Sequence, residues 1–257
     1  MVLDYCEDGN LRDYMNHSEK YITFKLKINY LLQIINGLKR IHHVEKVHKD
    51  FHSGNILFSK KSPFISDLGM CQPANQAVKK EGIYGVLPYV APEVLCGHQY
   101  TKAADIYSFG IVMNELLSEE TPFNDIPHDH ALAVNICKGF RPKISEDTPK
   151  FLADLITKCW DVKAENRPTA LELSQVLYRW DDVMRGTIVD DEIYSQGKEY
   201  DRIRENKLRS NKNRPKDIQT HPQAFYTSRL LNFKNLPKPV NSSDLSSYQM
   251  TNKSGNI

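Results

Sequence analysis

The sequence predicts a mainly α-helical domain over residues 1–184, followed by a basic, mostly disordered tail over residues 185–257. In the first part, apolar residues recur at the spacing of a helix face in four segments, whereas strand signals are few and short. The hydrophobic content and the charge both change near residue 185. A chain of 257 residues can bury one sizeable core, so a single large domain is expected.

The first long helix is predicted to end near His42 and His43. Its apolar residues follow one helix face: Ile28, Leu31, Leu32, Ile35, Leu38 and Ile41. A second helix is expected from Ala103 to Leu117, where apolar residues occur on nearly all sides. That pattern is typical of a helix buried in the middle of a domain.

Two further helices are predicted towards the end of this domain. Pro149 stands at the expected first position of a helix whose apolar stripe ends at Cys159. Thr169 and Glu172 form a capping box, because a hydroxyl and a carboxylate can each satisfy a free backbone N–H at a helix start. The last helix then runs to Met184. The predicted strands are Val2-Leu3, Ile56-Leu57-Phe58 and Phe64-Ile65-Ser66.

Charge and cysteine content exclude several classes of protein. The formal net charge of +2 is too small to indicate a nucleic acid or an anionic membrane as the main partner. The five cysteines are scattered without a C-x-x-C pair, which favours reduced thiols and a cytoplasmic location over disulfides or structural zinc. The acidic start of the chain and the lack of an apolar run of about 18 residues argue against secretion or membrane spanning.

The tail differs in composition from the domain. From Gly186 to Ile257, 14 of 72 residues are Leu, Ile, Val or Phe, which is too few for a core in a charged segment. Residues 185–257 carry 13 Lys and Arg against 8 Asp and Glu, a charge of +5. We therefore expect a flexible tail in which the basic run from Lys198 to Lys216 is solvated; docking of this run is the alternative.

A polar loop in the first half of the domain combines residues suited to phosphate chemistry. Asp50 is followed five residues later by Asn55, and Asp67 comes twelve residues after Asn55. Asp50 can accept a proton from a hydroxyl, and Asn55 and Asp67 are hard oxygen ligands for Mg²⁺. His48 and His52 have metal-ligand spacing, but no third ligand is nearby, so zinc is not expected.

Five motifs in this order and spacing resemble those of the protein kinases. They are His48-Lys49-Asp50-Phe51 through Asn55 for H-R-D-L-x-x-x-N, Asp67-Leu68-Gly69 for D-F-G, Ala91-Pro92-Glu93 for A-P-E, Asp105 to Gly110 for the start of the central helix, and Cys159-Trp160 with Asn166-Arg167-Pro168 for the C-W…R-P ending. The resemblance covers residues 1–184 and leans towards the tyrosine-kinase-like branch of the Ser/Thr kinases.

The resemblance implies an ATP-dependent enzyme of signal transduction that transfers the γ-phosphate to a hydroxyl of a protein substrate, with Ser or Thr favoured and Tyr not excluded. It assigns catalysis to Asp50, Lys49 and Asn55, and Mg²⁺ binding to Asn55 and Asp67. Residues placed around ATP are Asp4 and Cys6 at the adenine edge, Asn10 at the ribose, Leu57 under the adenine, and Asp67. Structural roles fall to His48, to a Glu93–Arg167 ion pair, and to Asp105 as an acceptor for the catalytic loop.

The sequence also departs from the family. Lys49 replaces the usual Arg, His52 replaces a phosphate-contacting Lys, and Val86 replaces a Thr beside the substrate hydroxyl. From Asp67 to Glu93 there is no Ser or Thr, so Tyr84 and Tyr89 are the phosphorylatable positions of the activation segment.

The largest departure concerns the N-terminal β-rich lobe, which is expected to be absent. The Gly-rich loop, the strand Lys and the helix Glu should precede the hinge, where only about three residues stand, and no G-x-G-x-x-G occurs. We therefore expect a hinge and a C-terminal lobe that is inactive alone and exposes a face to a partner. Two alternatives stay open: a pseudokinase-type binding module, and a small-molecule phosphotransferase, which the A-P-E and R-P motifs disfavour.

Overall fold

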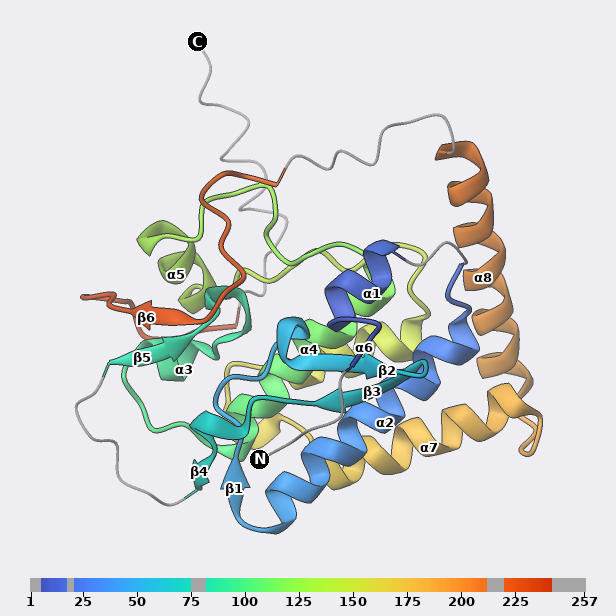
Figure 1. Cartoon of the computed structure of the whole chain (residues 1–257), viewed down its shortest axis with the longest axis horizontal. Coiled ribbons are helices and arrows are strands. Elements are labelled where there is room, and N and C mark those ends of the chain that lie inside the picture. Colours follow the sequence, from blue (N-terminus) through green and yellow to red (C-terminus); the bar gives the residue numbers. More distant parts are fainter. Residues whose placement is uncertain (1–5, 18–20, 75–81, 212–219, 242–257) are drawn as a thin grey trace.

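Helix α4 (Lys102–Ser118) runs through the centre of the computed structural model, and α2 (Phe24–His43) packs against it (Figure 1). The side-chain oxygens of Thr23 and Thr101 cap them, each accepting a hydrogen bond from a backbone N–H of the first turn. Both helices occur where the sequence predicts them. The structure describes residues 6–17, 21–74, 82–211 and 220–241.

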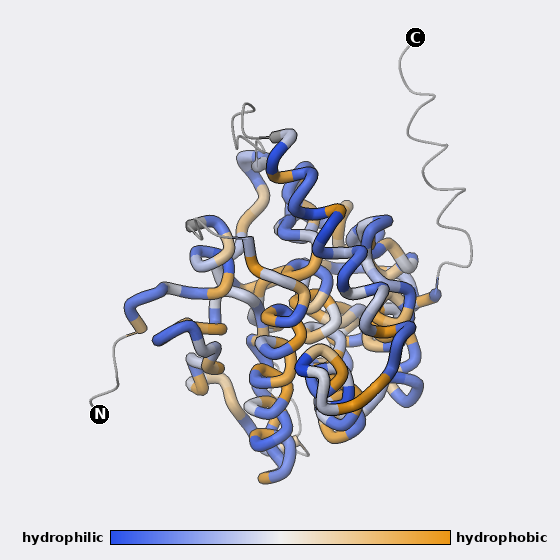
Figure 2. The backbone as a smooth tube through the Cα atoms, turned by 90° about the vertical axis from the view of Figure 1, so that its right-hand side faces the viewer, coloured by the Kyte–Doolittle hydropathy of each residue, from blue (hydrophilic) through white to orange (hydrophobic). Residues whose placement is uncertain are grey.

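Helix α4 is buried along its length from Ala104 to Ser118, as its apolar sequence predicts. The other helices that border the core bury one face and expose the other, so hydrophobic and hydrophilic positions alternate along them (Figure 2). Some polar groups inside α4 have partners: the Asn114 amide nitrogen donates to the Lys143 carbonyl at 3.2 Å, and the Ser108 hydroxyl donates to the Tyr89 carbonyl at 2.7 Å.

The remaining helices surround this pair. Helix α7 (Ala170–Arg185) packs along α2, and α6 (Lys150–Cys159) packs on α4. The predicted capping box of Thr169 and Glu172 is confirmed, whereas Pro149 is the N-cap of α6 and so stands one position before the predicted place. The shorter helices are α1 (Leu11–His17), α3 (Pro92–Leu95), α5 (His130–Cys137) and the 3₁₀ turns η1 (Ser53–Asn55), η2 (Leu68–Met70), η3 (Leu87–Tyr89) and η4 (Ala164–Asn166).

The strands of the described residues are short and pair two by two in antiparallel fashion. Strand β2 (Ile56–Ser59) pairs with β3 (Ser62–Ile65), and β1 (Lys46–Val47) pairs with β4 (Gln72–Pro73). These pairs confirm the strand predicted at 56–58 and move the next strand to 62–65. The predicted strand Val2-Leu3 lies outside the described residues.

The prediction of a disordered tail is wrong for two segments. Helix α8 (Asp191–Asn211) is 21 residues long, and residues 220–241 lie extended along the domain. In Figure 1, α8 stands on one side of the molecule and strand β6 (Arg229–Leu231) on the other, where it pairs with β5 (Ile83–Gly85). The expectation for residues 212–219 and 242–257 lies outside the described residues.

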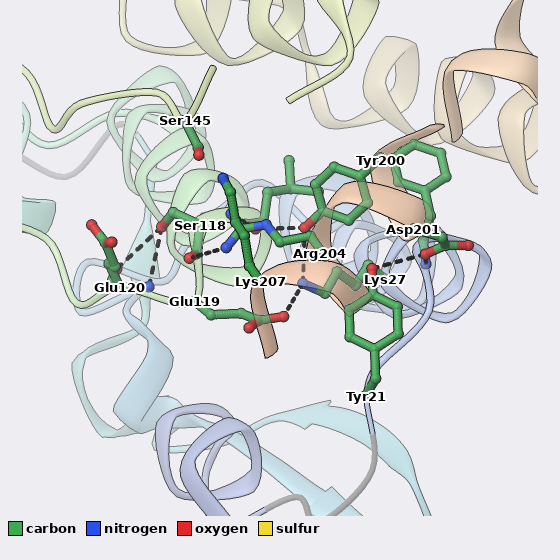
Figure 3. Close-up of polar contacts among 12 residues, drawn as sticks. Tyr21, Lys27, Ser118, Glu119, Glu120, Ser145, Tyr200, Asp201, Arg204 and Lys207 are labelled. Carbon is green, nitrogen blue, oxygen red and sulfur yellow. Dashed lines mark hydrogen bonds and ion pairs between the residues drawn. The ribbon is translucent and has the colours of Figure 1, made fainter. Parts of the chain in front are cut away.

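Individual polar contacts, not a high apolar content, hold α8 on the domain (Figure 3). Tyr200 is 1% exposed, and its hydroxyl donates to the Leu117 carbonyl at 2.6 Å. The same hydroxyl accepts a hydrogen bond from Lys27 Nζ at 2.9 Å, and Lys27 pairs with Glu119 at 2.5 Å. Composition alone misses this docking because a few buried polar side chains anchor an otherwise charged helix.

Close approach of α8 to α2 also depends on Gly197. A Cβ at this position would lie 2.7 Å from a ring carbon of Phe24, which is too close without a shift of one helix. Further along α8, Arg204 forms an ion pair with Asp147 at 2.7 Å. Contacts of Gly197 and Tyr200 near its middle, and of Arg204 closer to its C-terminal end, therefore hold α8 on the domain.

Residues 220–241 are held by hydrogen bonds to the loop before α5 and to α5 itself. The backbone N–H of His128 donates to the Gln223 carbonyl at 2.9 Å, and Val240 N donates to the Cys137 carbonyl at 2.9 Å. His130 Nε2 lies 2.9 Å from the Lys234 carbonyl oxygen. Among the described residues, no helix is long and apolar enough to cross a lipid bilayer.

Candidate active site

The polar loop between β1 and β2 is anchored by Asp105 at the start of α4. Asp105 is fully buried, and its carboxylate accepts hydrogen bonds from the backbone N–H groups of His48 at 2.8 Å and Lys49 at 3.1 Å. His42 Nε2 lies 2.9 Å from the same carboxylate. These contacts fix the backbone immediately before Asp50, where Lys49 adopts a left-handed φ of 71°.

Asp50 and Asn55 face each other across this loop. Asn55 Nδ2 donates to the Asp50 carbonyl at 2.9 Å and to Asp50 Oδ2 at 3.3 Å. Because the amide nitrogen is directed at Asp50, Oδ1 is the atom that Asn55 can offer to a cation. The His48 side chain links the loop to the segment before Asp67, because His48 Nε2 lies 3.0 Å from the Ser66 carbonyl oxygen.

Opposing effects set the pKa of Asp50, which is 6% exposed. Burial raises the pKa, but the nearby His52 imidazole and the hydrogen bond from Ser228 outweigh it and hold the pKa below its usual range. His52 Nε2 lies 3.6 Å from Asp50 Oδ1. The carboxylate is therefore ionised at neutral pH and able to accept a proton.

Asp67 lies on an exposed turn that is tied to the Asn55 backbone. The N–H and the hydroxyl of Ser66 both donate to the Asn55 carbonyl, at 2.8 and 2.9 Å. Asp67 has a left-handed φ of 52°, and Oδ1 accepts a hydrogen bond from Gly69 N at 3.4 Å. The loop and the turn therefore bring Asn55 and Asp67 onto neighbouring segments, as the predicted metal site requires.

These donors suit a cation that is shared with a ligand. Within the described parts of the chain, no group of three or more His, Cys, Asp or Glu is arranged to hold a metal ion. One amide oxygen and one carboxylate are hard oxygen donors, which fits Mg²⁺ held jointly with phosphate oxygens. They do not fit a zinc site.

Leu57 lies on the face of the β2–β3 pair that is turned away from the core. Its cross-strand partner Phe64 is 55% exposed, whereas Phe58, the next residue of β2, is fully buried. Leu68 on the adjoining turn is also 55% exposed. The sheet and the adjoining turn therefore present exposed apolar side chains.

Of the other residues expected around a nucleotide, Asn10 and Cys6 lie within the described residues. Asn10 forms a β-bridge with Leu57. The Asn10 side chain is directed at Asp13, and Asn10 Oδ1 accepts a hydrogen bond from the Asp13 backbone N–H at 3.1 Å. The Cys6 carbonyl accepts a hydrogen bond from Gly9 N at 3.3 Å. Asp4 lies outside the described residues.

Glu93 and Arg167 form a bidentate ion pair, with Nη1–Oε1 and Nη2–Oε2 distances of 2.7 and 2.9 Å. Arg167 is buried and also donates from Nε to the Asp161 carbonyl at 2.7 Å. The pair joins α3, which follows the activation segment, to the loop before α7. Such planar two-point geometry is available to a guanidinium and not to an ammonium.

A buried polar network beside the loop has no counterpart in the sequence predictions. Tyr89 donates to Glu115 Oε2 at 2.6 Å, Ser53 donates to Glu115 Oε1 at 3.0 Å, and Arg12 donates to Ser53 at 2.9 Å. Burial raises the pKa of Glu115, although Arg12 opposes this. The available sequence signal was Glu115, the single glutamate of α4, in a stretch that is predicted to be buried.

Lys49 and the two tyrosines of the activation segment lie in unlike surroundings. Lys49 Nζ donates to Gln72 Oε1 at 2.9 Å, so its ammonium faces the start of the activation segment. Tyr84 is 48% exposed on β5. Tyr89 is buried and bonded to Glu115, so this conformation does not present its hydroxyl for modification.

Ser228, from the tail, contacts the loop directly. Its hydroxyl donates to Asp50 Oδ2 at 2.5 Å. Nothing in the local sequence marks this serine, because the contact joins residues 178 positions apart. The contact between Ser228 and Asp50 therefore could not be predicted from the local sequence.

Comparison with known proteins places this fold and loop in a family. A family model for protein tyrosine and serine/threonine kinases matches residues 1–177. The chain is 28% identical over 173 residues to RGS domain-containing serine/threonine-protein kinase A of Dictyostelium discoideum, covering 67% of this chain and 15% of that protein. It is 29% identical over 187 residues to serine/threonine/tyrosine-protein kinase HT1 of Arabidopsis thaliana, covering 72% and 48%.

The chain belongs to the protein kinase family. It spans less than half the length of these two curated relatives. Family membership confirms the recognition made from the motifs.

Proposed function

We propose that this chain carries the catalytic loop and the protein-substrate surface of an ATP-dependent kinase that favours Ser or Thr as acceptor. The observation that carries the proposal is the hydrogen-bonded pair of Asp50 and Asn55 beside the turn of Asp67. The names of the relatives, serine/threonine kinases with one serine/threonine/tyrosine kinase, support this acceptor preference.

Asp50 would act as the base. Its ionised carboxylate would orient an acceptor hydroxyl and take its proton as the hydroxyl oxygen bonds to the γ-phosphorus, a contribution of about 10²–10⁴ in rate. Asn55 would hold the carboxylate in place through its amide nitrogen. Lys49 would add positive charge at the start of the activation segment.

Asn55 Oδ1 and the Asp67 carboxylate would hold Mg²⁺ together with the phosphates of ATP. When bound, the metal supplies neutralisation of the phosphate charge. Leu57 would lie under the adenine, the backbone of Asp4 and Cys6 at its edge. Asn10 would reach the ribose after releasing Asp13.

We propose further that this sequence supplies only the part of the nucleotide site that holds Mg²⁺ and one face of the adenine. It holds no G-x-G-x-x-G loop to cover the phosphates, so weak Mg·ATP binding and no protein phosphorylation are expected of the chain alone. The exposed Phe64 and Leu68 would then face a β-rich lobe or a partner. A binding module without activity is the second candidate, favoured by this exposed face.

Kinase activity is tested in the whole protein that carries this chain, with peptide libraries that offer Ser, Thr or Tyr. Asp50→Asn should lower transfer by about 10²–10⁴, and Asp67→Ala should abolish productive Mg·ATP binding. Glu146→Gln, an exposed carboxylate with 91% of its side chain accessible, is the matched control. Full activity of both site variants would contradict the assignment.

The half-site proposal is tested by thermal unfolding of the chain alone with millimolar Mg·ATP. A ligand at 100 times its dissociation constant would stabilise the fold by about 2.7 kcal/mol. We expect no shift of that size. A shift that Asp67→Ala abolishes would show that this chain suffices to bind the nucleotide.

A further inference from the structure

The tail crosses the face of the domain that holds the candidate base. Ser228 Oγ lies 2.5 Å from Asp50 Oδ2 and 3.2 Å from His52 Nε2. Ser228 precedes strand β6, which Figure 1 shows beside β5 of the activation segment. A hydroxyl from a distant part of the chain thus reaches the carboxylate that a substrate hydroxyl would need.

The hydrogen bonds around Ser228 have a fixed direction. His52 Nδ1 accepts a hydrogen bond from Gly54 N at 3.1 Å, so a neutral imidazole carries its proton on Nε2. Nε2 then donates to Ser228 Oγ, and the hydroxyl proton points to Asp50. The Ser228 oxygen thus accepts one hydrogen bond while its own proton is donated to the Asp50 carboxylate. This is the arrangement of a nucleophile with its general base.

The backbone after Ser228 is held in register by strand addition. Arg229 pairs with Gly85, and Leu231 pairs with Ile83, in an antiparallel ladder. Adding a strand to an exposed edge is a general mode of peptide recognition, because main-chain bonds accept many sequences. Gly85 has little room for a side chain, since a Cβ there would lie 3.0 Å from Val90.

Two side chains anchor the segment on either side of Ser228. Tyr226, two residues before it, donates to the Pro122 carbonyl at 2.9 Å and lies under the Arg12 guanidinium at 4.4 Å. Leu231, three residues after it, is 3% exposed. Backbone pairing with side-chain anchors at fixed positions is how an extended peptide is recognised with specificity.

We propose that residues 226–231 occupy the groove for a protein substrate and that Ser228 is a phosphoacceptor of this chain's own active site. The inference rests on the proposed kinase function and deepens it. It also defines a substrate class: an extended segment with a serine acceptor, an aromatic residue two positions before it and a leucine three positions after it.

Phosphoryl transfer to Ser228 needs no reactant other than Mg·ATP. Ser228 Oγ forms a bond to the γ-phosphorus, the bond from that phosphorus to the bridging oxygen breaks, and ADP leaves. The hydroxyl proton passes to Asp50 and then to water. The phosphoserine carries about −1.5 to −2 charges at pH 7 and would lie against the Asp50 carboxylate, so repulsion would release the tail and open the groove.

Groove occupancy is tested without catalysis, by binding of a fluorescent synthetic peptide that copies residues 222–234. In the wild-type chain the tethered tail competes at millimolar effective concentration, so binding should be weak. Leu231→Asp should tighten peptide binding at least 10-fold and speed amide exchange over residues 83–85. Leu171→Asp is the matched control, because Leu171 on α7 is 56% exposed, lies outside the proposed groove and should change neither measurement.

If Leu231→Asp alters neither peptide binding nor amide exchange, the groove is not where the tail lies and the inference fails. A synthetic peptide with alanine at the position of Ser228 should bind several-fold more weakly to Leu231→Asp than the unaltered copy does. Equal affinity of the two peptides would contradict the placement of Ser228 at the acceptor position.

Acceptor chemistry is tested by mass spectrometry of the whole protein that carries this chain, incubated with Mg·ATP. Phosphate should appear on Ser228, fall at least 10-fold in Asp50→Asn and persist in Thr227→Ala. Transfer to a free peptide but not to Ser228 would overturn the inference and leave the proposed function intact. No transfer to any acceptor would overturn the proposed function, and the acceptor role of Ser228 with it.

Discussion

The carboxylate of Asp105 accepts a hydrogen bond from the backbone N–H of His48, 57 positions earlier in the chain, at 2.8 Å. The same carboxylate accepts from Lys49 N, so one buried side chain of α4 satisfies two loop donors. A backbone donor left unsatisfied in the interior costs about 1–3 kcal/mol. The shape of the catalytic loop is therefore set by a helix that the loop does not belong to.

Asp105→Ala should therefore lower the free energy of unfolding by about 3 kcal/mol, because it leaves two buried N–H groups without acceptors. Urea denaturation measures this. Asp154→Ala removes an exposed carboxylate of α6 and should cost less than about 1 kcal/mol. Equal losses in the two variants would contradict the role of Asp105.

Removing either partner of the Glu93–Arg167 pair should destabilise the protein by about 3–5 kcal/mol, because it leaves either the buried Arg167 or the largely buried Glu93 without its ion-pair partner. Glu93→Ala and Arg167→Ala are compared by chemical denaturation with Glu146→Ala, whose pair with Lys143 is exposed. The double variant should cost less than the sum of the single changes. Losses below about 1 kcal/mol in both single variants would show that the pair does not bear on stability.

The docking of α8 should weaken in acid through Asp147. Burial raises the pKa of this carboxyl, but Ser145, Arg204 and Lys207 outweigh burial and hold the pKa below its usual range. A lowered native pKa gives stability that is fully present above the unfolded value of about 3.9 and is lost as the pH falls through the native pKa.

Unfolding measured from pH 7 to pH 3 checks this sign. The excess stability of the wild type over Asp147→Asn should shrink as the pH falls below about 4. An excess that stays constant, or grows, down to pH 3 would show that Asp147 does not titrate with folding.

The two tyrosines of the activation segment should differ in chemical reactivity. Tyr84 is 48% exposed, whereas Tyr89 is buried and its pKa is raised, chiefly by burial. Tetranitromethane, which reacts with accessible phenolates, should nitrate Tyr84 and spare Tyr89. Peptide mapping reads out both sites, and Tyr84→Phe should remove the signal of this segment. Nitration of Tyr89 at a similar rate would mean that the network around Glu115 opens readily.

Local periodicity was enough to predict the central helices. The apolar stripe from Ile28 to Ile41 became α2, and the apolar segment from Ala103 to Leu117 became α4, because burial of a helix face leaves its period in the sequence. The capping box of Thr169 and Glu172 was readable for the same reason, since both partners lie within one turn.

The spacing of Asp50, Asn55 and Asp67 was also contained in the sequence, because a short loop and its adjoining turn place these residues. Tertiary structure alone decided which distant residues meet them. Ser228 reaches Asp50, and Arg12 reaches Glu115, through contacts that leave no local pattern. The tail was misjudged for the same physical reason: its average composition is that of a solvated segment, while single residues such as Tyr200 find buried partners on a surface formed by the rest of the fold.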